Sequence, residues 1–226
     1  MKLKDILSPR IRDYRKPSKP MVTVATDADF CLETVDSGML TSQQMAHAAG
    51  RYLLGKSKSG RCIFWMIDEW GIVRDGRIGD SWVSLMLKAR EPQLLSNWYA
   101  RHCLFGLHLL NSESKGAVCI VESERSAVIL SELYPDNIWL ATMYPTNFTI
   151  SLLEPLCGRR VMLYPHTDET MSNYLCWLEI ADMAQRNMHL DICCSSVLED
   201  HATPEQKERK IDLVEFLYDK PHTYNP

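Results

Sequence analysis

The second half of the chain alternates short apolar runs with amphipathic stretches. Runs of the length of a buried strand occupy residues 116–122, 138–141, 160–164 and 189–194. Apolar side chains recur at helical spacing in four further stretches, residues 124–134, 149–157, 171–188 and 211–218. Strands that alternate with helices are typical of a parallel sheet with helices on both faces. We therefore predict an α/β domain, with a mainly parallel sheet and flanking helices, over residues 113–226.

The first half has a different pattern. Residues 42–54 place apolar side chains at helical spacing behind Thr41, a favourable cap, and Gly55 is expected to end this helix. Residues 61–68 and 72–78 are rich in β-branched and aromatic side chains around a Glu-Trp-Gly turn, which predicts a hairpin. We expect residues 82–112 to be mostly helical or irregular. The pattern thus predicts a smaller α+β region over residues 21–112, with a helix and a β-hairpin.

Composition places the chain among ordinary globular proteins. Its 226 residues are 46% hydrophobic and 24% charged, which excludes a collagenous, low-complexity or wholly disordered chain. The net charge of −4 is uneven, because residues 1–20 carry seven Lys/Arg against two Asp, a net +5, and the remainder carries −9. We interpret residues 1–20 as a flexible basic arm that either tracks a nucleic-acid backbone or only aids solubility.

Targeting and cysteine signals point to the cytoplasm. No signal-peptide core or bilayer-length apolar run occurs in the sequence, so we expect no membrane association. The eight cysteines form no C-x-x-C pair and no zinc-like spacing with histidine. Free thiols in a reducing cytoplasm are the expectation.

Acidic side chains stand at the ends of two predicted parallel strands. Glu122 ends the first strand, and Asp168 and Glu169 follow the third. Parallel strands put their carboxyl ends on one edge, where ligands collect, so these carboxylates are expected to converge. Converging carboxylates suit Mg²⁺ or Mn²⁺, which can orient phosphates in phosphoryl transfer. A simpler interpretation stays open, because acidic residues after strands also solvate loops and cap the next helix.

The run VESERSAVIL at residues 121–130, with LYPHTDE at residues 163–169, resembles a Toprim domain, the nucleotidyl-transfer module of bacterial primases and topoisomerases. More broadly, residues 40–220 are similar to the primase-like Toprim proteins of bacterial mobile elements. That similarity rests on short motifs in a fixed order, at residues 63–68, 74–77, 103–110, 120–124, 138–142, 198–203 and 211–217. The resemblance implies a Toprim-like fold in the second domain.

The resemblance also implies roles for individual residues. Glu122 matches the family's catalytic Glu, a general acid/base or metal ligand, and Asp168 matches the second acid of its D-x-D motif. The first acid is replaced by His166, whose neutral imidazole is a poor Mg²⁺ ligand. Glu169 is a further carboxylate for the metal, although it stands outside the matching position. Asp212 matches a recurrent family Asp, but an Asp in a first helical turn is also simply favoured by the helix dipole.

Two functions follow, and His166 separates them. The first is Mg²⁺-dependent nucleotidyl or phosphoryl transfer by a DNA primase-like enzyme, with nucleotides and an RNA primer among its partners. The second is a catalytically degenerate Toprim-like protein, with the metal bound weakly or lost. Such a protein would bind nucleic acid or assist replication or mobilisation proteins. A generic α/β domain unrelated to nucleic acid is a third interpretation, which would follow if Glu122 and Asp168 lay at opposite sheet edges.

Three arginines are candidates for nucleic-acid contacts. Arg74 and Arg77 lie on the predicted hairpin with Trp65 and Trp70 nearby, a combination that can bind phosphate and stack on a base. Arg125 follows the acidic end of the first parallel strand. A half-buried hairpin with an outward charged edge is the simpler interpretation of the first pair.

Overall fold

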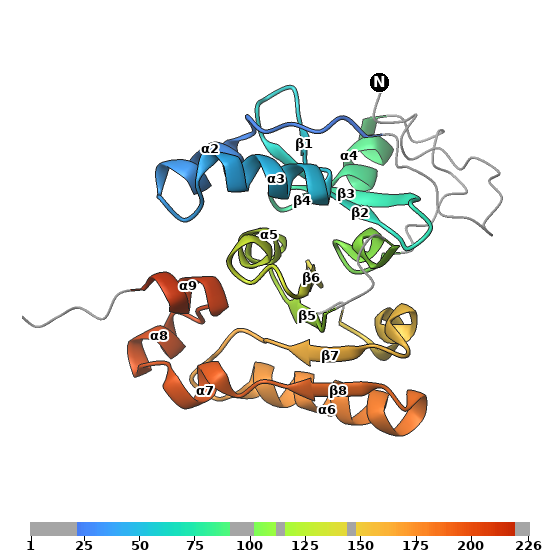
Figure 1. Cartoon of the computed structure of the whole chain (residues 1–226), viewed down its shortest axis with the longest axis vertical. Helices are drawn as coiled ribbons and strands as arrows, with labels where there is room; N and C mark the ends of the chain where they lie inside the picture. The colour runs from blue at the N-terminus through green and yellow to red at the C-terminus, as the bar shows by residue number, and fades with distance from the viewer. Residues whose placement is uncertain (1–21, 91–101, 112–115, 144–147, 220–226) are drawn as a thin grey trace, which may run out of the picture. The chain divides into compact units, whose positions relative to one another are not determined.

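A computed structural model describes residues 22–90, 102–111, 116–143 and 148–219 (Figure 1). The predicted basic arm and part of the 82–112 region lie outside these residues. The chain divides into two compact units, Met1–Ser114 and Lys115–Pro226, which are described separately below. None of the described helices is both long and apolar enough to cross a membrane.

The N-terminal unit is built on an antiparallel sheet. Its strands are β1 (Gly55–Lys56), β2 (Cys62–Ile67), β3 (Val73–Ile78) and β4 (Ser81–Trp82), hydrogen-bonded in that order. The predicted hairpin is confirmed as the pair β2 and β3, in which Trp65 lies opposite Gly76. The helical elements of the unit are α2 (Asp29–Asp36), α3 (Ser42–Tyr52), α4 (Val83–Arg90) and the 3-10 helix η2 (Leu107–Asn111).

Helix α3 begins and ends for local reasons. The Thr41 hydroxyl accepts a hydrogen bond from the Gln44 amide at 3.3 Å, and the Gln44 side chain accepts from the Thr41 amide at 3.0 Å, which forms a capping box. The predicted cap is therefore present. The predicted end is displaced, because Leu53 adopts a left-handed conformation with φ 56° and ends the helix there, while Gly55 belongs to β1.

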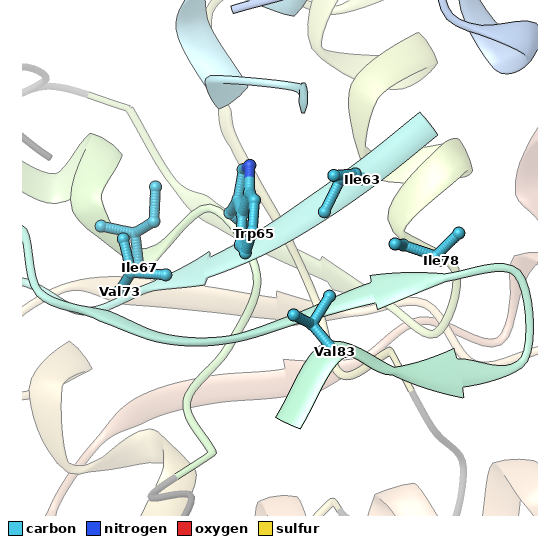
Figure 2. Packing of buried hydrophobic residues seen from close by; sticks show 6 residues of the cluster. All are labelled: Ile63, Trp65, Ile67, Val73, Ile78 and Val83. Carbon is cyan, nitrogen blue, oxygen red and sulfur yellow. The ribbon is translucent and has the colours of Figure 1, made fainter. Parts of the chain in front are cut away.

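Strand β2 is buried on both faces and forms the centre of the N-terminal unit. On one face Ile63, Trp65 and Ile67 pack with apolar side chains of β3 and α4, as Figure 2 shows. On the other face the Phe64 ring lies 5.3 Å from Phe30 and 5.9 Å from Phe105. A strand covered on both sides reads as a continuous apolar run rather than an alternating one.

Two glycines leave room for the Trp65 ring. A Cβ atom added to Gly76 would lie 2.6 Å from the ring atom Cε3, and one added to Gly55 would lie 2.6 Å from Nε1. No real Cβ atom approaches so closely, so both strands beside β2 need glycine at these positions for the indole to lie flat between them.

The C-terminal unit contains a four-stranded parallel sheet, as predicted. Strands β5 (Val118–Val121), β6 (Ile138–Ala141), β7 (Arg160–Leu163) and β8 (Asp191–Cys194) stand in the order β6-β5-β7-β8. In Figure 1, β7 and β8 run side by side with a long helix along them. The flanking helical elements are α5 (Glu124–Leu133), η4 (Ile150–Leu156), α6 (Ser172–Met188), α7 (Val197–His201), α8 (Pro204–Glu208) and α9 (Leu213–Tyr218).

This strand order creates a topological switch point. From β5 the chain moves to β6 on one side, and later enters β7 on the other side of β5. The connections that leave β5 and β7 therefore diverge, and in open α/β sheets a ligand crevice forms between such diverging connections. Glu122 directly follows β5, and the 164–171 loop directly follows β7, so both stand at this point.

We expect Gly76→Ala to lower the free energy of unfolding by about 1–3 kcal/mol, because the new methyl group overlaps the Trp65 ring. The matched control is Gly50→Ala in α3, where an added Cβ meets nothing within 4 Å. That substitution should raise stability by about 1 kcal/mol through helix propensity. Urea unfolding of the three proteins measures both effects, and equal stability of Gly76→Ala and the parent would contradict the packing described here.

Candidate functional site

A cavity of about 400 Å³ lies at the switch point of the C-terminal unit. It brings together residues that follow β5, residues that follow β7, and the first turn of α6. Glu122 and Asp168 both line it, so they stand at the same edge of the sheet. The lining residues are Glu122, His166, Thr167, Asp168, Glu169, Thr170, Ser172, Asn173 and Lys210.

The Glu122 carboxylate is buried, with 5% of the residue exposed. Its Oε1 atom accepts a hydrogen bond from the His166 amide at 3.3 Å and another from the side-chain amide of Asn173. The same Asn173 nitrogen donates to the His166 carbonyl at 3.0 Å. Asn173 therefore ties Glu122 to the loop after β7, and these donors replace the water that the carboxylate loses.

The His166 imidazole lies between two buried carboxylates. Its Nδ1 atom is 3.7 Å from Glu122 Oε2, and its Nε2 atom is 3.9 Å from Asp212 Oδ2. Both distances exceed a hydrogen bond but are within range of an ion pair when the ring is protonated. Nε2 is buried and makes no hydrogen bond within the described part of the chain. The imidazole thus occupies the space between Glu122 and Asp212.

Asp212 has a structural role as well. It precedes α9, where its Oδ1 accepts from the Glu215 amide at 2.8 Å and its amide donates to Glu215 Oε2 at 2.9 Å, a capping box. Its Oδ2 accepts from the Ser126 hydroxyl of α5. The helix-end role weighed from the sequence is therefore present, together with proximity to His166.

Both oxygens of the Asp168 carboxylate accept hydrogen bonds from Thr170 and from the first turn of α6. Its Oδ1 accepts from the Thr170 amide and hydroxyl and the Ser172 amide, at 2.8, 2.6 and 3.2 Å. Its Oδ2 accepts from the Ser172 hydroxyl and the Asn173 amide at 3.1 and 2.8 Å. Burial raises the pKa of Asp168, but the bonds from Thr170, Asn173 and Ser172 outweigh burial and hold that pKa well below its usual range. The capping alternative thus describes what Asp168 does in this structure.

The remaining candidates of this unit are peripheral. Glu169 is exposed and lines the cavity. Arg125 is exposed on α5 and is not among the residues that line it. Asn173, which the sequence reasoning missed, carries a weak local signal as a polar residue in the first turn of a helix, and its reach to Glu122 depends on the fold.

The hairpin candidates in the N-terminal unit are engaged within their own turns. Arg74 contacts Asp68 Oδ2 through Nε at 2.6 Å and through Nη2 at 2.5 Å. Asp68 Oδ1 accepts from the amides of Trp70 and Ile72, so this pair holds the β2–β3 turn. Arg77 donates to the Gly79 carbonyl at 2.9 Å and pairs with Asp80 at 3.5 Å. Trp65 is buried against Gly76 and cannot stack on a base.

The residues at the cavity do not fit the magnesium ion that the resemblance implies. Mg²⁺ takes a near-octahedral set of oxygen ligands. Here the two Asp168 oxygens together accept hydrogen bonds from five donors, and an imidazole separates Glu122 from Asp212. Within the described ranges, no three His, Cys, Asp or Glu side chains are grouped as a metal ion would require.

Residues 32–167 match the model of a family described as a domain of unknown function (DUF6371), and this stretch is more than half of the chain. The chain belongs to this family. The DUF6371 match begins in the N-terminal unit and takes in the hairpin, Glu122 and His166, and it stops just before Asp168. A comparison with curated proteins gives no match.

We expect Asp168→Asn to lower the free energy of unfolding at neutral pH by about 1–2 kcal/mol, because an amide nitrogen would face amide donors at the start of α6. The folded-state pKa of Asp168 is lowered, so its contribution is complete above the unfolded value of about 3.9 and is lost as pH falls below it. The difference from the parent should therefore shrink in acid.

Urea titrations at neutral pH and near pH 3 measure that difference. The control is Glu169→Gln, which removes the neighbouring exposed carboxylate and should leave stability within about 0.5 kcal/mol. A deficit of Asp168→Asn that stays constant down to pH 3 would contradict the role given to the charged carboxylate.

Proposed function

We propose that the C-terminal unit is a Toprim-like domain without a working metal site, and that this DUF6371 protein binds nucleic acid as an accessory to replication or mobilisation. The observation that carries the proposal is the place of His166. It stands where the resembled family has the first acid of its D-x-D motif, and its imidazole lies between Glu122 and Asp212.

The hydrogen bonds at the cavity support the same proposal. Glu122 Oε1 already accepts from His166 and Asn173, and the Asp168 oxygens serve α6. A metal would have to compete with these donors, whereas a protein that only binds its ligand keeps them. The chain itself supplies a positive charge to the cavity, since Lys210 borders it.

Nucleic acid as the ligand rests on the resemblance and on the basic residues 1–20, which lie outside the described residues. Lys/Arg-rich segments bind the phosphate backbone without sequence preference. The proposed activity is therefore salt-sensitive binding of DNA in the cytoplasm, with replication or mobilisation proteins as partners, and with no chemical step at Glu122.

Primase-like nucleotidyl transfer is the second candidate. It is favoured by one observation, that Glu122, Asp168 and Glu169 border one cavity at the switch point of a parallel sheet. In that function Glu122 would act as general acid or base on the attacking hydroxyl, and magnesium or manganese would neutralise charge on the nucleotide.

We expect the full-length protein to bind single-stranded DNA equally well in Mg²⁺ and in EDTA, and to incorporate no nucleotide on a primed template. Mg²⁺ should leave the Tm of the parent unchanged. In His166→Asp, a carboxylate replaces the imidazole between Glu122 and Asp212, and Mg²⁺ should raise the Tm by about 2–4 °C. Fluorescence anisotropy and thermal unfolding measure these effects, with His166→Asn as the control that removes the imidazole without adding charge.

Mg²⁺-dependent incorporation by the parent that disappears in Glu122→Gln would overturn the proposal in favour of the enzyme. If the parent protein binds DNA in neither buffer, the proposal is overturned and the enzyme is not supported either.

A further inference from the structure

A second group of polar residues surrounds a buried carboxylate in the N-terminal unit. Asp75 in β3 has no exposed surface. Its Oδ1 accepts from the amides of Gly76 and Ser84 at 2.7 and 3.0 Å. Its Oδ2 accepts from the Ser84 hydroxyl at 2.6 Å and lies 3.3 Å from His102 Nε2. Asp75 thus links the sheet, the first turn of α4 and a histidine from a later segment.

This arrangement orients the imidazole. When the ring is protonated, both nitrogens carry a proton, so Nε2 donates to Asp75 and Nδ1 can donate to an acceptor such as a phosphate oxygen. The ring also stacks on Trp82, with centroids 4.4 Å apart and planes at 28°. Two independent contacts, to Asp75 and to Trp82, therefore hold the ring in one plane.

The His102 side chain is held in this way but is not covered, because 28% of it is exposed. The nitrogen opposite Asp75 is the part of the ring that the carboxylate does not engage. That nitrogen is Nδ1, since the contact to Asp75 is made by Nε2.

The residues around this imidazole point to a phosphate group. Arg77 is the cross-strand partner of Trp82 in the β3–β4 pair, so their side chains leave the same face of the sheet. Asp75 precedes Arg77 by two residues and shares that face. Arg77 already donates to the Gly79 carbonyl and pairs with Asp80, and a guanidinium presents five donors in a planar fork that suits phosphate. The face thus combines a guanidinium, an oriented imidazole and an indole.

We propose that His102, oriented by Asp75 and supported by Trp82 and Arg77, forms a phosphate-contact site for a single strand of nucleic acid. His102 and Arg77 contact the backbone, and Asp75 is a positioning residue. The inference rests on the proposed nucleic-acid function, but it places the contact on the hairpin unit rather than at the cavity beside Glu122. It also replaces Arg74 and Trp65, which are engaged in the turn and the core, by His102 and Trp82.

The test measures binding of a short fluorescent single-stranded DNA oligonucleotide to the full-length protein by anisotropy at several salt concentrations. His102→Gln should raise Kd about tenfold, the expected cost of one lost hydrogen bond to a charged group. Arg77→Gln should also weaken binding, and should reduce the slope of log affinity against log salt by about 0.7 per lost phosphate contact. His47→Gln, at an exposed histidine of α3 in the same unit, is the matched control and should leave Kd unchanged.

Thermal unfolding of each variant separates binding from folding. If His102 has only a structural role, His102→Gln lowers the Tm but the folded variant binds DNA with the parent affinity. In that case Arg77→Gln also keeps the parent salt slope. That result would overturn the inference while the proposed function stands. Absence of DNA binding by the parent would overturn both, and loss of affinity in His102→Gln and Arg77→Gln but not in His47→Gln would support both.

Discussion

A carboxylate can be buried only when hydrogen bonds or an opposite charge replace the water that it loses, and this requirement shapes the cavity of the C-terminal unit. Glu122 follows the central strand β5 and has little exposed surface. The amide of His166 and the side chain of Asn173 meet this requirement from the loop after β7 and the first turn of α6. The same loop and turn are also organised by Asp168, which accepts from the Ser172 and Asn173 amides.

Other buried carboxylates of the protein are stabilised in the same way. Asp68 accepts two turn amides and pairs with Arg74, and Asp75 accepts two amides and faces His102. Asp168 accepts amides and hydroxyls at the start of α6. In each case nearby backbone amides donate to the carboxylate, and the carboxylate fixes a turn or a helix start. This is why an acidic residue after a strand does not by itself indicate a metal site.

Helices and strands could be predicted where their pattern of apolar residues extends over enough positions. The strand and helix pattern of residues 116–194 gave the parallel sheet, and the turn between two apolar runs gave the hairpin, because burial imposes these periods directly on the sequence. Helix α2 was missed, since it has eight residues and no side-chain cap. Strands β1 and β4 have two residues each, and α7 and α8 have five each, too few for a periodic signal.

The sequence by itself determined that Glu122, His166 and Asp168 would stand at one sheet edge, because parallel strands must end on the same side. Only the tertiary structure decided what these side chains do there. Asn173 reaches Glu122 across 51 residues, and Ser126 reaches Asp212 across 86. Such contacts depend on strand order and on the path of the loops, which the local spacing of apolar residues does not record. Hydrophobic periodicity reports which face of an element is buried, whereas the partner of a polar atom is set by whatever element the fold places against it.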